Sequence, residues 1–230
     1  MKTAIVIPTY NEQQNINTLT KRLFALNLPD LSIIFVDDNS PDGTATAIKG
    51  LANTYQIELI ERPGKLGLGS AYIAGFKRAL AEGAELIFEM DADLSHAPED
   101  IPAMINAAEN GADLVIGSRK IAGGNIIGWN IWRHLMSNGA MMAARCILGL
   151  KTKDVTAGFR CYKRQVLEKI DLDKIKSNGY AFQEEMLYRV EKAGYKIAEL
   201  PVTFVDRTVG RSKLSTKDIW EFFKVMLKLR

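Results

Sequence analysis

The sequence is poor in cysteine, in net charge and in long apolar runs, and each scarcity excludes a class of protein. Two cysteines, Cys146 and Cys161, occur among 230 residues. They are too few for the disulfide framework of a small secreted domain, so a reducing intracellular compartment is expected. The formal net charge of +3 gives no reason to expect nucleic acid as a partner, although a local basic patch for an anionic substrate remains open.

No apolar run reaches the length of a transmembrane helix. The strand-like run within residues 1–10 is too short and wrongly flanked for a signal peptide. The segment 219–230 comes nearest to a membrane span, but Glu221, Lys224 and Lys228 interrupt it. What is present, 47% hydrophobic and 25% charged residues without a repeat or linker, suits a single globular domain over residues 1–230.

The first half of the chain alternates continuous apolar runs with amphipathic segments. The runs predict strands over 3–8, 31–38, 56–62, 85–93 and 112–119, and the segments between them predict helices over 11–26, 44–55, 67–83 and 98–111. Such alternation is typical of a parallel sheet covered by helices on both faces.

The second half is less regular. It predicts helices over 128–150 and 179–195, a strand within 154–167, and a strand over 196–207. Pro201 lies inside the last of these, and proline cannot donate to a ladder, so this strand is expected at an edge of the sheet.

Each unusual polar cluster follows a predicted strand. The clusters are PTYNE, VDDNSPDGT, RPGKLGLG, DADLSH and GSR, in chain order. In parallel α/β sheets the ligand crevice lies outside the carboxyl ends of the strands. The sequence therefore predicts one site built from all five clusters.

The pair Asp91 and Asp93 is the strongest single feature. If both belong to a strand, their side chains share a face, and two carboxylates so close repel each other unless a cation lies between them. A hard metal such as Mg²⁺ or Mn²⁺ is therefore the preferred interpretation. The alternative is a solvated turn with a helix N-cap, which accounts for Ser95 but not for two acids.

Other motifs are weaker. The segment 64–69, GKLGLG, is either a phosphate cradle or an ordinary glycine-rich turn. Asp37 and Asp38 either cap the next turn or hold a ribose hydroxyl or a base edge. His96 and His134 lack metal-ligand spacing, so a solvated loop and a helix face are expected for them, and neither is assigned to a metal.

Six segments in order resemble the dolichol-phosphate mannosyltransferase family of inverting glycosyltransferases. They are IVIPTYNE, VDDNSPDGT, ERPGKLGLGSAYIAGFKRA, MDADLSHAPED, GSR and FVDRTVGRSKL. The resemblance implies a GT-A fold, which is a nucleotide-sugar-binding, Rossmann-like, mostly parallel sheet with helices on both faces. It also implies transfer of mannose from GDP-mannose to dolichyl or another polyprenyl monophosphate, with Mg²⁺ or Mn²⁺. The expected place is the cytoplasmic face of a membrane, with membrane-anchoring subunits as candidate partners.

The resemblance also implies a role for individual residues. The residues that would line the nucleotide site are Pro8, Tyr10, Glu12, Val36, Asp38 and Lys65. Asp91 and Asp93 would hold the metal, and Ala92 would touch the nucleotide through its backbone. The residues that would face the diphosphate, the sugar or the acceptor phosphate are Arg119, Arg207 and Lys213. Arg133 and Ser137, four apart on one helix face, match the acceptor-phosphate pair. Ser95 departs from the pattern, because some relatives have Gln there.

Two other functions stay open on the sequence. One is a sister enzyme that uses another nucleotide sugar, such as UDP-glucose, and the other is a non-catalytic nucleotide-sugar-binding subunit. A membrane surface is the expected partner of segment 126–136, which carries Trp129 and Trp132, and of an amphipathic helix over 216–230. The alternative for that helix is a core element that caps the sheet.

Overall fold

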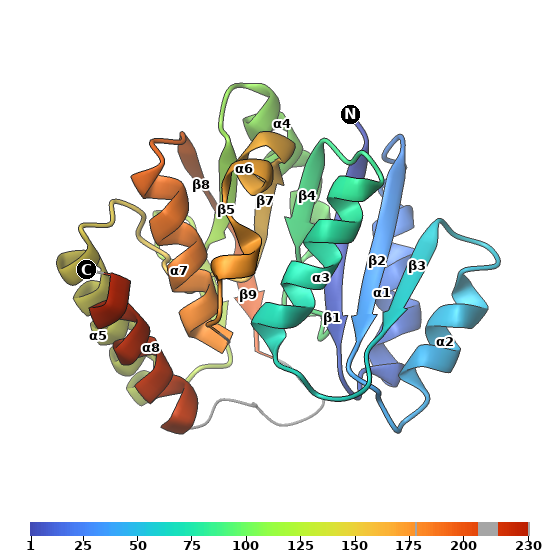
Figure 1. Cartoon of the computed structure of the whole chain (residues 1–230), viewed down its shortest axis with the longest axis horizontal. Coiled ribbons are helices and arrows are strands. Elements are labelled where there is room, and N and C mark those ends of the chain that lie inside the picture. Colours follow the sequence, from blue (N-terminus) through green and yellow to red (C-terminus); the bar gives the residue numbers. More distant parts are fainter. Residues whose placement is uncertain (178, 207–215, 230) are drawn as a thin grey trace.

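Parallel strands form the centre of the molecule (Figure 1). The computed structural model describes residues 1–177, 179–206 and 216–229, and of residues 180 and 216–221 the backbone alone. The strands of the large sheet are β1 (Thr3–Thr9), β2 (Leu31–Asp37), β3 (Ile57–Glu61), β4 (Leu86–Glu89), β5 (Leu114–Ser118), β7 (Arg160–Lys163) and β8 (Ile197–Pro201). Within the described ranges their order is β3-β2-β1-β4-β7-β5-β8, and β7 alone runs antiparallel to its neighbours. The mostly parallel sheet is confirmed.

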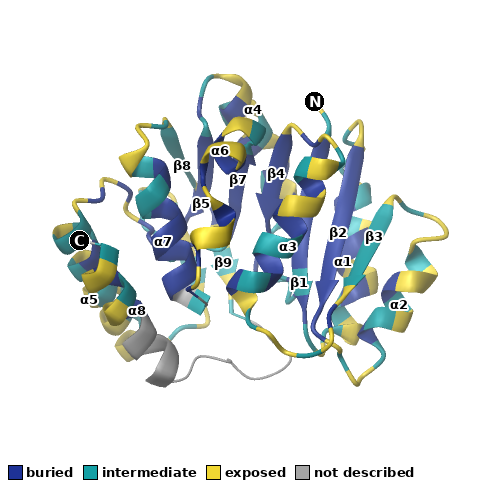
Figure 2. Cartoon of the chain, in the orientation of Figure 1, coloured by how far each residue is buried: buried dark blue, intermediate teal, exposed yellow. Residues whose placement is uncertain are grey.

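Helices cover both faces of this sheet, because alternate residues of each strand point to opposite sides. In β1, Ala4 and Val6 join a core cluster with α3 (Leu68–Ala81), α6 (Arg164–Lys169) and α7 (Gly179–Lys192). Ile5 and Ile7 join a second cluster with α1 (Gln13–Phe24), α2 (Thr44–Leu51) and α4 (Ile101–Glu109). Figure 2 shows the resulting pattern of buried strands between half-buried helices.

Two glycines let α3 approach its neighbours closely. A Cβ on Gly75 would lie 2.2 Å from Cγ1 of Val6, and a Cβ on Gly69 would lie 2.3 Å from the carbonyl oxygen of Ser177. Real Cβ atoms do not approach other atoms so closely, so a larger residue at 75 would push the helix away from β1, and one at 69 would push it away from the backbone at Ser177. Gly69 and Gly75 therefore serve helix packing.

The predicted strand over 196–207 is in fact two strands. β8 lies at the edge of the large sheet, as expected, and ends at Pro201. After Val202 the chain enters β9 (Thr203–Val205), which pairs in parallel with β6 (Asn125–Ile127) in a separate sheet. Proline has no N–H to continue a ladder, so the change of sheet occurs there. β6 was not predicted.

Two further helices complete the fold. α5 (Ile131–Leu148) corresponds to the predicted helix 128–150, and α8 (Thr216–Leu229) to the amphipathic tail. α8 packs against both α7 and α5. On α8, Phe222 and Met226 are buried in the core, whereas Phe223 and Leu227 are exposed. The stripe with Phe222 and Met226 therefore caps the core, which was the alternative interpretation, and the stripe with Phe223 and Leu227 leaves an apolar surface outside. In the described part of the chain, no helix is long and apolar enough to cross a bilayer.

Candidate active site

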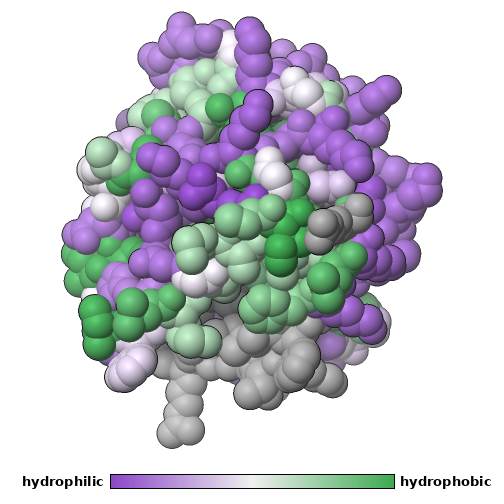
Figure 3. Space-filling view, turned by 90° about the vertical axis from the view of Figure 1, so that its left-hand side faces the viewer, coloured by the Kyte–Doolittle hydropathy of each residue, from purple (hydrophilic) through white to green (hydrophobic). Residues whose placement is uncertain are grey.

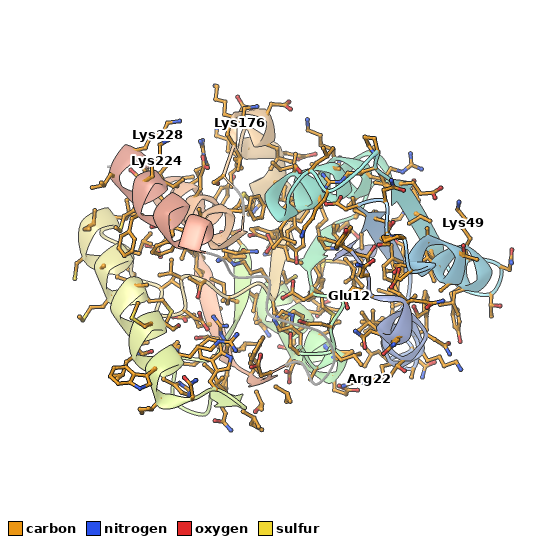
Figure 4. All side chains as sticks on the ribbon, turned by 90° about the horizontal axis from the view of Figure 1, so that it is seen from below. Glu12, Arg22, Lys49, Lys176, Lys224 and Lys228 are labelled. Atoms are coloured by element: carbon orange, nitrogen blue, oxygen red, sulfur yellow. The ribbon has the colours of Figure 1, made fainter. Side chains whose placement is uncertain are left out.

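The carboxyl ends of β1, β2, β4 and β5 meet at one edge of the sheet, which Figure 4 shows from below. The register pairs Pro8 with Val36 and Thr9 with Asp37, so the first two polar clusters lie side by side. Glu12, which follows β1, lies toward the middle of this edge, and Lys49 lies at its rim (Figure 4). The structure thus gathers the clusters as the sequence predicts.

Asp37 has a structural role at the end of β2. Its carboxylate accepts hydrogen bonds from the hydroxyl of Thr9 (2.8 Å), and from the backbone N–H (2.8 Å) and hydroxyl (2.6 Å) of Ser40. Of the two alternatives for this acid, capping of the turn is the one observed.

Asp38 pairs with Arg62, a residue that the sequence analysis did not single out. Both side chains are buried, and the guanidinium contacts the carboxylate through Nε and Nη2. Arg62 also donates to the hydroxyl of Ser70 (2.7 Å) and to the carbonyl of Gly67 (3.1 Å). The ion pair therefore ties the glycine-rich turn to the end of β2. On the outer side of this turn, the Lys65 ammonium lies 4.8 Å from the centre of the Tyr10 ring.

Asp91 and Asp93 do not belong to a strand. β4 ends at Glu89, and Leu94 has a φ of 63°, which turns the chain sharply. Oδ1 of Asp93 accepts from the N–H of Ser95 (3.1 Å) and from its hydroxyl. Oδ1 of Asp91 accepts from the hydroxyl of Tyr72 (3.2 Å). The strand expected over 85–93 therefore ends four residues early, at Glu89, and the turn that was the alternative follows it, with side-chain hydrogen bonds that orient the acids.

His96 is buried, so the expectation of a solvated loop is wrong. Its ring stacks on Phe159, with centroids 5.1 Å apart, and Nδ1 accepts from the N–H of Asp91 (3.3 Å). Burial lowers the pKa of His96, and Asp91 and Asp93 oppose the shift. The His96 ring thus supports residues 91–93, which we call the DAD turn, and it stays neutral near pH 7. His134, in contrast, lies half-buried on α5 as expected.

Arg119 is held by Asp154, a fully buried residue that the sequence analysis also missed. Asp154 accepts from the backbone N–H (2.9 Å), Nε (2.7 Å) and Nη2 (2.7 Å) of Arg119. Its own loop is fixed by Glu199, which accepts from the N–H of Asp154 (3.1 Å) and from the hydroxyl of Ser118 (2.7 Å). The guanidinium thus has one orientation, at the end of β5.

A buried polar network lies beneath the DAD turn. Arg160 is fully buried and donates to the carbonyls of Val155, Ala157 and Gln183. Glu89, at the end of β4, accepts from the hydroxyl of Tyr162 (2.9 Å). Burial raises the pKa of Glu89 to about 7, although Arg160 favours the carboxylate. Arg160 therefore fastens the 155–157 loop to α7, below the two acids.

The predicted acceptor pair lies on α5. Nη1 of Arg133 donates to Asp206 (2.6 Å), and its guanidinium lies 4.2 Å from the centre of the Trp129 ring. Ser137 is one turn further along the same helix, half-buried. Trp129 packs against Arg133 and Phe204 and is half-buried, whereas Trp132 is exposed. Arg207 and Lys213 lie outside the described residues.

The two aspartates fit a hard divalent cation in the chemistry of their oxygens. In the described ranges, no group of three or more His, Cys, Asp or Glu side chains has the geometry to hold a metal. Mg²⁺ is commonly held by one or two carboxylates and completed by waters and substrate phosphates. Asp91 and Asp93 match that incomplete protein ligand set.

Comparison with known proteins agrees with the fold and shows the family. Residues 4–171 match the glycosyl transferase family 2 model. The chain is 42% identical to polyprenol monophosphomannose synthase of Mycolicibacterium smegmatis, over 97% of this chain and 85% of that protein. It is 43% identical to undecaprenyl-phosphate mannosyltransferase of Micrococcus luteus, over 94% of this chain and 88% of that protein.

Solved structures share the fold at much lower identity. Glucosyl-3-phosphoglycerate synthase from Mycobacterium tuberculosis, in complex with Mn²⁺, UDP-glucose and phosphoglyceric acid, superposes with a TM-score of 0.69 at 18% identity, covering 98% of this chain and 79% of that one. The same protein with Mg²⁺ and UDP gives 0.71 at 18% identity, covering 99% and 79%. The expected GT-A fold is confirmed. The chain belongs to glycosyl transferase family 2, in the group that includes the two bacterial polyprenyl-phosphate mannosyltransferases.

Proposed function

We propose that this protein transfers mannose from GDP-mannose to a polyprenyl monophosphate, of which dolichyl phosphate is one example. The observation that carries the proposal is identity of 42–43% to two polyprenyl-phosphate mannosyltransferases over nearly the whole chain. The site supports it, because acids, cations and a glycine-rich turn converge on the carboxyl edge of a nucleotide-binding sheet.

The donor would lie across β1, β2 and β4. The residues proposed to line the nucleotide are Pro8, Tyr10, Glu12, Val36, Asp38 and Lys65, with the backbone of Ala92. Asp91 and Asp93 would hold Mg²⁺ or Mn²⁺, which when bound stabilises the negative charge of the departing diphosphate. The cations proposed to face the diphosphate, the sugar or the acceptor are Arg119, Arg207 and Lys213. Charge-assisted hydrogen bonds from such groups act without a proton transfer.

The acceptor would meet the donor at α5, where Arg133 and Ser137 lie. A phosphate monoester already carries negative charge near pH 7, so its oxygen can attack C1 of mannose directly. The bond from C1 to GDP then breaks, GDP leaves, and the configuration at C1 inverts. No general base is needed, and His96 is engaged with the backbone of Asp91.

A membrane surface is the proposed place of reaction, on the cytoplasmic face, with the protein bound peripherally. α5 and α8 lie on the same side of the molecule (Figure 1), Figure 3 shows hydrophobic surface gathered on the lower half of that side, and several apolar residues of the two helices are exposed. These residues are Ile131, Trp132, Leu135, Met136, Met142, Phe223 and Leu227. We name them the apolar face. A polyprenyl chain is insoluble in water, so its phosphate must be met at the bilayer interface.

The decisive experiment is transfer of radiolabel into organic-extractable lipid. Purified protein with polyprenyl phosphate and Mg²⁺ or Mn²⁺ should accept label from GDP-mannose and not from UDP-glucose. Label from UDP-glucose would identify the sister activity, and no transfer from either would favour a non-catalytic subunit. Asp93→Asn should lower the rate by at least about a hundredfold, since a metal contributes several kcal/mol to the transition state.

Asp173→Asn is the matched control, because it removes the same charge from an exposed ion pair with Lys77, and neither residue belongs to the proposed site. Its rate should equal that of the wild type. If Asp93→Asn kept near-normal turnover, or if a chelator left the wild type active, the metal assignment would be wrong.

A further inference from the structure

Three cationic side chains surround the ring of Trp129. Measured to the ring centre, Arg133 Cζ lies at 4.2 Å, Lys120 Nζ at 5.8 Å and Arg119 Cζ at 5.8 Å. Arg119 and Lys120 follow β5, whereas Arg133 belongs to the first turn of α5. We call these three cations with Trp129 the tryptophan cluster. Like charges this close repel one another unless counter-charges or a bound anion compensate them.

Counter-charges compensate two of the three cations. Arg119 is paired with Asp154, and Arg133 with Asp206 at 2.6 Å. Lys120 instead donates to the amide oxygen of Asn138 (2.8 Å), which is neutral. Burial lowers the pKa of Lys120 and the charge of Arg119 adds to the shift, whereas the Asp154 carboxylate opposes it. With Asp154 and Asp206 as their counter-charges, the three cations of the tryptophan cluster keep one positive charge in excess among these described residues, and Lys120 is the cation without an ion pair of its own there.

The partner of Lys120 connects it to the acceptor pair. Asn138 directly follows Ser137, and Ser137 lies one helical turn after Arg133. Lys120 thus reaches over from the end of β5 to the same turn of α5. Its ammonium has three N–H donors, so it can keep Asn138 and Trp129 as neighbours and still bind an anion.

We infer that Lys120 binds the phosphate monoester of the acceptor and supplies the net positive charge that Arg133 and Ser137 lack. This inference rests on the proposed function. A phosphate monoester carries a charge of about −1.5 to −2 at pH 7, whereas Arg133 is already neutralised by Asp206 and Ser137 is uncharged. The excess charge of the tryptophan cluster has the sign and place that this ligand requires.

Two ligands and three variants test the inference. Farnesyl phosphate and farnesol, in neutral detergent micelles, differ only in the phosphate. Lys120→Met removes the ammonium and keeps most of the stem, and Lys120→Arg restores a cation. Lys192→Met is the control, because Lys192 also lies over an aromatic ring, that of Tyr188 at 5.1 Å, and donates to a neutral oxygen. Equilibrium binding and the KM for each substrate are measured.

Lys120→Met should bind farnesyl phosphate roughly tenfold more weakly, as the loss of one charge-assisted hydrogen bond predicts. Its affinity for farnesol and its KM for GDP-mannose should not change. Lys120→Arg should recover most of the loss, and Lys192→Met should match the wild type. Equal loss in the Met and Arg variants would mean that packing against Trp129 matters rather than charge, and would overturn the inference.

Two further outcomes separate this inference from the proposed function. A wild type that transfers mannose, with an unchanged Lys120→Met variant, overturns the inference alone. A wild type that neither binds farnesyl phosphate nor transfers mannose overturns both. Phospholipid headgroups offer the same phosphate chemistry, so binding to phosphatidylglycerol vesicles is measured as well. If Lys120→Met weakens vesicle binding but not farnesyl phosphate binding, Lys120 contacts the bilayer and the acceptor assignment is wrong.

Discussion

Changing Asp154 to Asn removes the negative charge that faces Arg119 and keeps the size of the side chain. Asp154 is fully buried, and the Arg119 side chain is 7% exposed, so water cannot replace the lost charge. Breaking a buried ion pair from one side costs about 3–5 kcal/mol. Asn can still accept one hydrogen bond, so we expect the free energy of unfolding to fall by about 3 kcal/mol.

Urea unfolding of the wild type and the variant at pH 7 measures this loss. Lys49→Met is the control, because Lys49 and Glu61 form an ion pair with side chains 60% and 52% exposed. That pair should contribute less than about 0.5 kcal/mol, and its contribution should shrink with salt. The loss in Asp154→Asn should be nearly independent of salt, since the pair is out of contact with solvent.

The pH dependence provides a second check. Burial opposes ionisation, but the Arg119 guanidinium holds the pKa of Asp154 below its ordinary value of 3.8. The stability from this carboxylate is therefore fully present above pH 3.8 and is lost as the pH falls through the lower folded-state pKa. The difference between wild type and variant should be constant from pH 5 to 8 and shrink in acid. A difference below about 0.5 kcal/mol at pH 7, or one that grows in acid, would refute this reasoning.

Two further predictions concern other parts of the molecule. Burial raises the pKa of Glu184 to about 8, and Glu185 adds to the shift; neither carboxyl oxygen of Glu184 has a hydrogen-bond partner in the described part of the chain. Because the folded-state pKa exceeds the ordinary 4.5, ionisation of Glu184 destabilises the fold as the pH rises from 4.5 to 8. The free energy of unfolding of Glu184→Gln, measured in urea, should therefore rise relative to that of the wild type by on the order of 1–3 kcal/mol between pH 5 and pH 9. An equal difference at both pH values would contradict this. Changing Trp132, which is 73% exposed, and Met136 to Ser should weaken binding to anionic vesicles by roughly tenfold or more in flotation, whereas Leu66→Ser, an exposed control outside the apolar face, should not. Equal losses would exclude the apolar face as the membrane contact.

The strands were predictable because they are buried on both faces. β1, β2 and β5 are continuous apolar runs, and such runs leave few alternatives to a covered parallel sheet. The carboxyl edge follows from that topology, which is why the polar clusters were located correctly as a set. β6 was missed because it has three residues and no apolar pattern.

The contacts within the site could not be predicted from local patterns. Asp38 and Arg62 are 24 positions apart, and Arg119 and Asp154 are 35 apart. Such pairs depend on tertiary geometry, although Arg160, a charged residue inside the apolar run FRCY, was a visible signal of a buried network. The burial of His96 was missed for the same reason, since a hydrogen-bonded loop has no periodicity, and the turn at Asp93 and Ser95 was only the alternative to a strand.

The place of β7 has a consequence for the order in which the protein is made. β7 follows β5 in the chain, yet it lies between β4 and β5 in the sheet. The ribosome therefore synthesises β4 and β5 before β7, the strand that lies between them. About seventy residues separate the end of β4 from the start of β7, which takes several seconds to translate at roughly 5–20 residues per second. During that time the inner edges of β4 and β5 present unpaired backbone groups, which are binding sites for chaperones and for other nascent chains. Ribosome-bound chains halted before residue 160 should engage chaperones, and chains released in full should not. Arg160 belongs to this strand, so the network beneath Asp91 forms only once β7 has paired with β4.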